Sequence, residues 1–405
     1  MTSAPVERRE RIDSIDVLRG FAVLGILMMN IQDFAMITAG YTNPSVSGFY
    51  EGRDFWIWLF AHTFYDQKFM TIFSLLFGAG IVLFTSRVEA REESARALHY
   101  RRTGWLILFG ILHAYFIWSG DILYSYGMCA LWVYPFRRRS ARALMIAGVL
   151  IMCVAPLVMV GLGNYLPGAD PVYFHEMLDT EWAPPAAVVE AERDATLGSW
   201  WDLVKHRAPR VLVFQTFLLL MWIVWRVGGL MLVGMALYKL GVFSAERSNR
   251  FYATLLVAGS ALGIPLVLYG VRQNVAHEWY GGYSMFLGGQ WNYAGSVGIA
   301  LAWIGLVMLA CRSPRFGGIK RRLAAVGRMA FSNYIGQSII CAIVFHGFAP
   351  WTYMQTDRTA QVLIVLAVWA LQLAVSPWWL ERFRFGPLEW LWRSLSYRQR
   401  QPFRL

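Results

Sequence analysis

Long apolar runs alternate with short polar segments along the whole chain. A helix needs about 20 residues to cross a hydrocarbon core, and by this measure we predict ten membrane-spanning helices. Two of them are short and adjacent, which favours a single tight hairpin. Such a hairpin requires local bilayer thinning, shielding by neighbouring helices or a partly re-entrant path. The pattern therefore predicts an all-α, polytopic transmembrane helix bundle in which residues 1–405 form one domain. The ten runs are 17–37, 69–85, 104–120, 121–136, 144–162, 211–240, 251–271, 291–311, 326–348 and 360–380.

Composition supports a membrane location. Hydrophobic residues make up 57% of the chain, aromatic residues 16% and charged residues only 15%. A soluble domain of this size has no need for so much apolar surface. Tryptophans lie near the ends of several runs, where an indole ring sits well at the membrane interface; they include Trp105, Trp118, Trp201, Trp291 and Trp378.

Basic residues predict the orientation. Arginine and lysine cluster after alternate runs, so with ten spans all the clusters lie on one side. The positive-inside rule makes that side the cytoplasm and places both termini there. Residues 381–405 are then a cytoplasmic tail, while the acidic segment 164–209 is an external loop that either caps a cavity or is a solvated connector. Because topology and anionic lipid account for the net charge of +12, we expect no nucleic-acid partner.

Polar residues near the ends of the first two runs suggest chemistry. Asp16 and Arg19 lie three apart, on one helical face. They either belong to a capped, positive-inside helix start, with Asp13 or Ser14 as the cap, or bind an anionic head group or cofactor phosphate. His62 and Asp66 lie four apart, just before Lys68. Such a carboxylate can hold the imidazole in one tautomer for general-base catalysis, although a wetted interfacial helix explains the same spacing.

Ionisable residues inside the apolar runs are costly in hydrocarbon and commonly mark function. His113 and Asp121 would be about 12 Å apart along one straight helix. They can meet only if the chain turns at Gly120, with Asp121 capping the next helix. Arg226 interrupts the sixth run beside two glycines and needs a partner or water, whether in a cavity or in a structural ion pair.

Two further groups of residues favour structural roles. Asn333 and Gln337 share a helical face in the ninth run, where bonding between helices explains them and a role in binding substrate is the alternative. The four cysteines lie in or beside apolar runs with no C-x-x-C spacing, which indicates small core residues without disulfides or bound metal. They are Cys129, Cys153, Cys311 and Cys341.

Five short motifs carry a resemblance to a known family. They lie at 14–22, 68–78, 110–123, 327–334 and 385–393, the last reading Phe-Gly-Pro-Leu-Glu-Trp-Leu-Trp-Arg. Together they resemble the YeiB-type family of bacterial multi-pass membrane proteins of unknown function. The resemblance implies a location in the bacterial cytoplasmic (inner) membrane.

The YeiB-type family is in turn distantly similar to transmembrane acyltransferases of the heparan-α-glucosaminide N-acetyltransferase type. The shared feature is the Asp-x-x-Arg-Gly opening, here Asp16 to Gly20. This similarity implies transfer of an acyl group from a cytoplasmic donor to an acceptor on the far side. It implies acyl-CoA as a co-substrate and no tightly bound cofactor. The implied partners are membrane lipid and a glycan or lipid acceptor.

These observations lead to a hypothesis of catalysis in a polar cavity shared by the ionisable side chains. His62 or His113, oriented by Asp66 or Asp121, would deprotonate an acceptor hydroxyl or amine. The donor and substrate would be bound by a second group of residues: Asp16, Arg19, Lys68, Arg226, Asn333 and Gln337.

Two other classes of protein fit the same residues. The first is a transporter or lipid flippase for a small anionic or amphipathic solute, with Arg226 and His113 along its path. The second is a membrane scaffold or sensor without turnover, in which the buried charges only fix helix packing.

Overall fold

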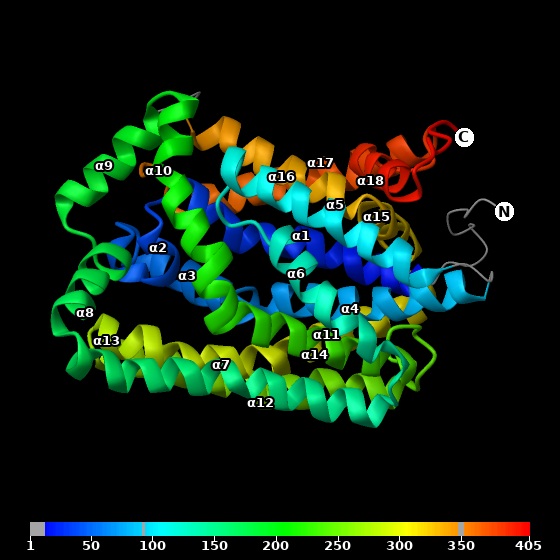
Figure 1. The fold of residues 1–405 in the computed structure, drawn as a ribbon, viewed down its shortest axis with the longest axis horizontal. Coiled ribbons are helices and arrows are strands. Elements are labelled where there is room, and N and C mark those ends of the chain that lie inside the picture. Colours follow the sequence, from blue (N-terminus) through cyan, green and yellow to red (C-terminus); the bar gives the residue numbers. More distant parts are fainter. Residues whose placement is uncertain (1–12, 91–93, 347–351) are drawn as a thin grey trace.

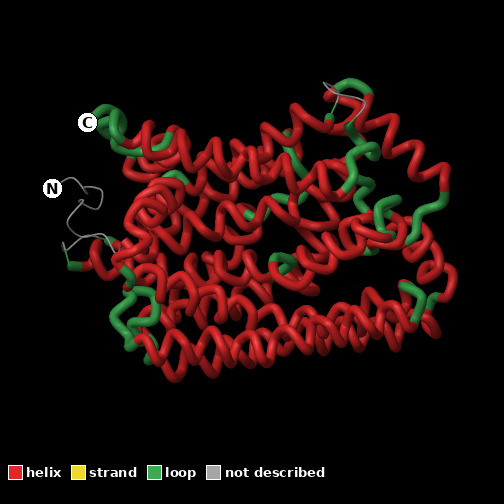
Figure 2. Tube along the Cα trace, turned by 180° about the vertical axis from the view of Figure 1, so that it is seen from behind, coloured by secondary structure: helices red, strands yellow, loops and turns green. Residues whose placement is uncertain are grey.

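The structure is a computed structural model that describes residues 13–90, 94–346 and 352–405. In these ranges the chain is helical, with no strand beyond a single isolated bridge between Phe383 and Arg404. The long helices run side by side along the longest axis of the molecule (Figures 1 and 2). The prediction of an all-α helix bundle is confirmed.

Seven helical segments are long and apolar enough to cross a membrane, judged by length and composition within the described residues. Each coincides with a predicted run. The shorter apolar helix α16 (Ala330–Phe345) coincides with part of the ninth run. The count of ten spans and the side on which the termini lie stay predictions. The seven segments are Asp13–Ala35, Gly52–Glu89, Ala141–Ala169, Trp200–Lys239, Asn249–Ala276, Gly281–Arg312 and Arg358–Leu380.

In the numbering of Figure 1, α1 to α6 are Asp13–Ala35, Ala39–Thr42, Gly52–Phe64, Lys68–Glu89, Ala95–Phe116 and Leu123–Val133. Helices α7 to α12 are Ala141–Ala169, Pro171–Met177, Ala186–Leu197, Trp200–Val213, Val224–Lys239 and Asn249–Ala276. Helices α13 to α18 are Gly281–Tyr283, Gly289–Arg312, Gly317–Arg328, Ala330–Phe345, Arg358–Leu380 and Pro387–Tyr397. A π-helical stretch, Phe214–Ile223, joins α10 to α11.

Glycines let several helices pack with their backbones almost touching. A Cβ added at Gly78 of α4 would lie 1.9 Å from the carbonyl oxygen of Met231 in α11, and one at Gly234 would lie 2.0 Å from that of Leu75. Helices α12 and α14 cross in the same way near Gly259. Close approach of this kind replaces the hydrophobic effect, which cannot drive helix association within lipid.

Three interruptions of the helices shape the interior. Gln67, with φ of 62°, separates α3 from α4. A non-helical turn separates α5 from α6, as the hairpin prediction requires. Met329 separates α15 from α16, so the prediction that one helix covers 326–348 is wrong in its first residues. Irregular backbone at membrane depth is tolerated where protein surrounds it.

The two polar segments are both folded. Within 164–209 the chain forms the end of α7, then α8, α9 and the start of α10, at one end of the bundle (Figure 1). Glu192 fixes α9 to the start of α2 by accepting bonds of 2.9 Å from the amide and hydroxyl of Thr38. At the other end, residues 381–405 are not a free tail, because α18 packs on α5 and α16.

Candidate functional site

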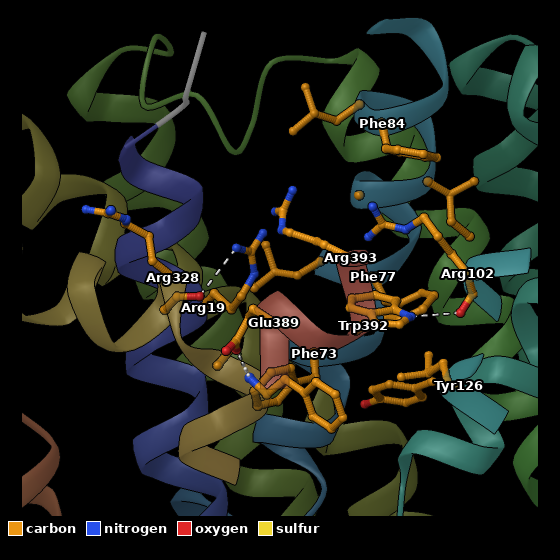
Figure 3. Close-up of a pocket in the computed structure, with 18 of the residues that line it drawn as sticks. Arg19, Phe73, Phe77, Phe84, Arg102, Tyr126, Arg328, Glu389, Trp392 and Arg393 are labelled. Carbon is orange, nitrogen blue, oxygen red and sulfur yellow. Dashed lines mark hydrogen bonds between the residues drawn. The ribbon is translucent and has the colours of Figure 1, made fainter. Parts of the chain in front are cut away.

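A cavity of about 350 Å³ opens at the end of the bundle that carries α18 (Figure 3). Helices α1, α4, α5, α16 and α18 contribute most of its wall. Six arginines line it, five of them half-buried and Arg384 exposed. The full set is Arg19, Arg87, Arg102, Arg328, Arg384 and Arg393.

The remainder of the cavity is largely apolar. Phe73, Leu76 and Phe77 come from one face of α4, and Tyr126 lies opposite them on α6. In Figure 3, Phe73 and Tyr126 lie on the side of the cavity away from the guanidinium groups of Arg393 and Arg102. The site is therefore amphipathic, with a basic part and an aromatic part.

Both carboxylates in the wall already have partners. Asp16 accepts a bond of 2.8 Å from Arg19, as their spacing in the sequence predicts. Glu389 of α18 accepts bonds from the amides of Phe331 and Ser332, at 2.7 and 3.1 Å, and from the Ser332 hydroxyl at 2.5 Å. Burial raises the pKa of the Glu389 carboxyl, and the donors at Ser332 and Phe331 oppose that rise. Among the described residues that line the cavity, arginines thus outnumber carboxylates.

Arg102 is held by aromatic rings. Its guanidinium carbon lies 4.3 Å from the ring centre of Phe84 and 4.4 Å from that of Trp392. The Trp392 indole also donates a bond of 2.9 Å to the Arg102 carbonyl (Figure 3). Stacking of this kind holds a guanidinium in place while leaving its edge able to bind an anion.

His113 and Asp121 form a buried pair beyond the inner wall of the cavity. His113 Nδ1 lies 2.7 Å from Asp121 Oδ2, and each side chain is 1% exposed. Asp121 Oδ1 accepts the amide of Tyr124 at 2.8 Å and so caps the start of α6, as predicted. His113 Nε2 has no hydrogen-bond partner. This is the arrangement of an oriented general base, with one nitrogen fixed by a carboxylate and the other available.

Tyr334 lies between this pair and the cavity. Its ring centre is 5.2 Å from that of His113, and its hydroxyl accepts the amide of Ile122 at 3.3 Å. Tyr334 and Ile122 both line the cavity, whereas His113 and Asp121 do not. One layer of side chains therefore separates the imidazole from the open space.

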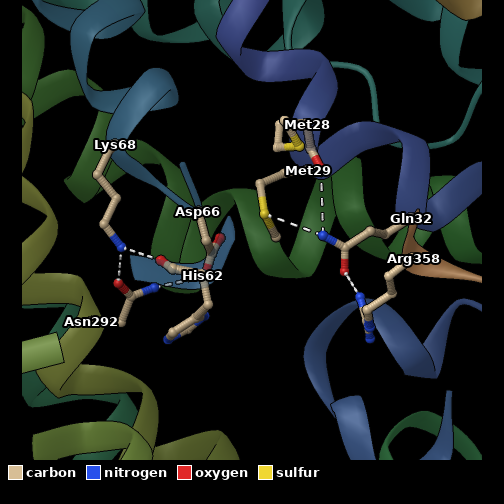
Figure 4. A network of polar contacts seen from close by, with 8 residues as sticks. All are labelled: Met28, Met29, Gln32, His62, Asp66, Lys68, Asn292 and Arg358. Carbon is tan, nitrogen blue, oxygen red and sulfur yellow. Dashed lines mark hydrogen bonds and ion pairs between the residues drawn. The ribbon is translucent and has the colours of Figure 1, made fainter. Parts of the chain in front are cut away.

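The other predicted pair belongs to a separate network (Figure 4). His62 Nδ1 lies 3.1 Å from Asp66 Oδ2, which also accepts a bond of 2.7 Å from Asn292. Lys68, fully buried, donates to the His62 carbonyl at 2.6 Å and to Asn292 Oδ1 at 2.5 Å. The structure thus brings His62, Asp66 and Lys68 together, and Asn292, which no sequence pattern singled out, joins them.

Arg226 is enclosed in its own shell. It is fully buried, its guanidinium lies 4.0 Å from the ring centre of Tyr293, and it donates to the Tyr293 carbonyl at 2.7 Å. Its other donated bonds go to the hydroxyls of Thr71 and Ser296. The expectation of one polar cavity shared by His113, Asp121 and Arg226 is wrong, because each buried group is satisfied mainly by its nearest neighbours, as low polarity demands.

Asn333 and Gln337 also lie outside the cavity. Asn333 donates to the carbonyl of Val326 and to Ser376, each at 3.1 Å. Gln337 donates to the carbonyl of Val23 at 3.0 Å and to Gln372 at 2.9 Å. These bonds join α16 to α1 and α17, which is the structural role considered from the sequence.

Sequence reasoning missed most of the basic wall of the cavity. Arg102 and Arg393 belong to clusters assigned to topology, and Glu389 and Trp392 belong to the 385–393 motif, which carried no assigned chemistry. The high content of charged residues and tryptophan in this motif, just after the last span, was the feature of the sequence that could have indicated these site residues. Among the described residues, no three His, Cys, Asp or Glu side chains gather in a way that could hold a metal ion.

Comparison with known proteins identifies relatives over the full length. A family model described as "Protein of unknown function (DUF418)" matches residues 237–399. The chain is 29% identical to the uncharacterized protein YeiB of Escherichia coli (strain K12), covering 97% of this chain and 98% of that protein. It is also 29% identical to the uncharacterized protein YxaH of Bacillus subtilis (strain 168), covering 98% and 97%.

No solved structure gives a significant match. The apolar helical bundle and the two relatives agree with the resemblance found in the sequence motifs. The chain is therefore similar over nearly its whole length to YeiB-type proteins of unknown function, and the family model matches its C-terminal part.

Proposed function

We propose that this protein is a membrane acyltransferase that moves an acyl group from a cytoplasmic donor to an acceptor on the outer side of a bacterial inner membrane. The observation that carries the proposal is the His113–Asp121 pair. Its Nε2 atom has no partner, and it lies one side chain behind a cavity with a basic wall. Acyl-CoA, with its phosphates and apolar chain, is the donor that we propose for that cavity.

In the proposed reaction, His113 is neutral and donates a hydrogen bond from its Nδ1–H to Asp121. The lone pair of the imidazole is then on Nε2. Nε2 takes the proton from the acceptor hydroxyl or amine as that oxygen or nitrogen attacks the thioester carbonyl carbon. The carbon–sulfur bond then breaks, and the CoA thiolate leaves and receives the proton from Nε2. The products are the acylated acceptor and free CoA.

This reaction requires Tyr334 to move. The Tyr334 ring closes the cavity toward His113, and its hydroxyl is held by a single long bond from the amide of Ile122, at 3.3 Å. Rotation of that ring would connect the cavity to Nε2 without unfolding a helix. With acyl-CoA bound and no acceptor present, closure by this ring would also keep His113 from activating water against the thioester.

The alternative is a transporter for an anionic or amphipathic solute. Its supporting observation is the buried charge on the other side of α4. Lys68 and Arg226 are both fully buried, and Asp66 is the one carboxylate bonded within the Lys68 network. Ionisable groups at this depth often mark ion or proton pathways. Lys68, Asp66 and Arg226 do not line the cavity beside α18, which favours the enzyme.

The deciding experiment is an acyl-transfer assay with protein reconstituted in vesicles, [14C]acetyl-CoA outside and candidate glycan or lipid acceptors inside. His113→Ala and Asp121→Asn should each lower transfer at least about a hundredfold, as loss of a general base does. His175→Ala, on the exposed helix α8, is the matched control. Transfer that survives His113→Ala would contradict the proposed role of His113. Solute uptake with no transfer would support the transporter.

A further inference from the structure

We infer that the cavity beside α18 binds an amphipathic anion with one hydrocarbon chain. The head group would bear a phosphate and lie among the arginines, and the chain would lie among the rings of α4 and α6. This inference extends the proposed function by naming a ligand class, but it rests on the cavity itself. Binding can therefore hold even if no acyl group is transferred.

The charge distribution around the cavity favours an anionic head group. Six arginines line the space, and the two carboxylates there already accept bonds from Arg19, Ser332 and Phe331. A cluster of guanidinium groups matches the geometry of phosphate oxygens. Arg102 lies between Phe84 and Trp392, and these two rings hold the plane of its guanidinium group.

The apolar wall favours a hydrocarbon chain. It is formed by side chains one helical turn apart on α4, among them Phe73, Leu76, Phe77 and Gly80. Gly80 matters because a Cβ built there meets no atom within 4 Å, so the chain would pass over it. A stripe of rings and a glycine, continuous with a basic rim, is complementary to a molecule with a charged end and an apolar end.

The volume argues for one chain. About 350 Å³ is near the lower end of the range of about 300–1,000 Å³ typical of small-molecule sites. A two-chain phospholipid would have to leave one chain outside in the bilayer. Single-chain anions come from two sources, acyl-CoA from the aqueous side and lysophospholipids from the membrane, and both share a phosphate and one acyl chain.

Binding of four matched ligands to the purified full-length protein tests the inference by native mass spectrometry and thermal stabilisation. The ligands are lauroyl-CoA, lauroyl lysophosphatidylglycerol, zwitterionic lauroyl lysophosphatidylcholine and two-chain phosphatidylglycerol. We expect one or both single-chain anions to bind at least about tenfold more tightly than the last two. The zwitterionic ligand lacks the net charge, and one charged contact is worth about that much. Phosphatidylglycerol has a second chain that the cavity volume does not hold. Which of the two anions binds distinguishes the aqueous source from the membrane source.

Two variants and two controls locate the site. Gly80→Leu places a side chain in the apolar part, where an added Cβ meets no atom within 4 Å, and should weaken binding at least about tenfold while the protein stays folded. Gly104→Leu, at an exposed glycine with equal room, should not. Arg393→Gln should weaken binding of the anions, whereas Arg382→Gln, outside the cavity, should not.

Three results would overturn the inference. They are full binding to Gly80→Leu, equal affinity for the zwitterionic and anionic chains, and tightest binding of phosphatidylglycerol. Failure of the proposed function gives a different result. In that case the anion binds and Gly80→Leu lowers its affinity, but no acyl group is transferred.

Discussion

Replacement of Glu389 tests how the cavity wall is held together. Glu389 lies in the first turn of α18 and accepts the first amides of α16, while Ser332 of α16 accepts the amide of Leu388 at 3.0 Å. The two helix starts therefore cap each other. Amides in a first helical turn have no partner within their own helix, so an outside acceptor is needed where water is excluded.

The magnitude follows from the bonds lost. Glu389→Ala removes the acceptor of the Phe331 and Ser332 amides and of the Ser332 hydroxyl. Loss of a helix cap costs about 1–2 kcal/mol, and each buried donor left without a partner costs about 1–3 kcal/mol. With some relaxation of α18, we expect about 3 kcal/mol of lost stability. Glu389→Gln keeps one oxygen for the amides and should cost about 1 kcal/mol.

The assay is reversible unfolding in mixed micelles, followed by tryptophan fluorescence. Glu381→Ala is the control, because that carboxylate is 73% exposed and lies 3.8 Å from Arg382. An exposed pair of this kind contributes little. If Glu389→Ala unfolds at the same denaturant concentration as the wild type and Glu381→Ala, then α16 and α18 do not depend on this cap.

Dependence on pH gives a second readout of the same carboxyl. Burial raises the pKa of Glu389 in the folded protein above its unfolded value of about 4.5. Between these two pKa values the folded state holds more protons than the unfolded state, so its stability falls as the pH rises through that window. Glu389→Gln should remove this part of the pH dependence. An unchanged slope in the variant would show that Glu389 does not titrate in that way.

Three further predictions concern the other buried groups. Gly78→Ala should destabilise the fold by at least about 2 kcal/mol in the same unfolding assay, since its Cβ would lie 1.9 Å from the Met231 carbonyl oxygen. Arg226→Ala should cost about 3 kcal/mol by opening a cavity, and a smaller loss would argue against tight packing there. Tyr334→Ala should raise hydrolysis of acyl-CoA relative to transfer, measured as free CoA per acylated acceptor, and an unchanged ratio would argue against closure by this ring.

Periodicity and local spacing predicted a large part of this molecule. The apolar runs located the long helices because a bilayer demands length and hydrophobicity from each span by itself. Contacts between residues close in sequence were also predictable, as His62–Asp66 and Asp16–Arg19 show. The His113–Asp121 contact followed from one further step, a chain turn before Asp121.

Contacts between distant segments were not predictable in this way. Asn292 joins the Lys68 network from more than two hundred positions along the chain, and Glu389 caps a helix that starts at Ala330. Neither residue stands out in a hydrophobic pattern. Arg102 and Arg393 were visible, but the positive-inside rule already explained them. One arginine can satisfy both a topological rule and a binding site, and composition does not separate the two.

The separation of the His113–Asp121 pair from the other buried charges bears directly on mechanism. His113–Asp121, the Lys68 network and Arg226 have different neighbours, so a substrate in the cavity beside α18 would meet only the first of them, through Tyr334.

The Lys68 network lies instead at the break between α3 and α4, where Gln67 adopts a left-handed conformation. Lys68 bonds the carbonyl of His62 across that break and so fixes the angle between the two helices. The rings of α4 form the apolar wall of the cavity. If α4 shifts when a ligand enters, the hydrogen bond from Lys68 to the His62 carbonyl must break or change its geometry. Lys68→Met should therefore alter ligand affinity at a distance, and unchanged affinity would show that the two regions act independently.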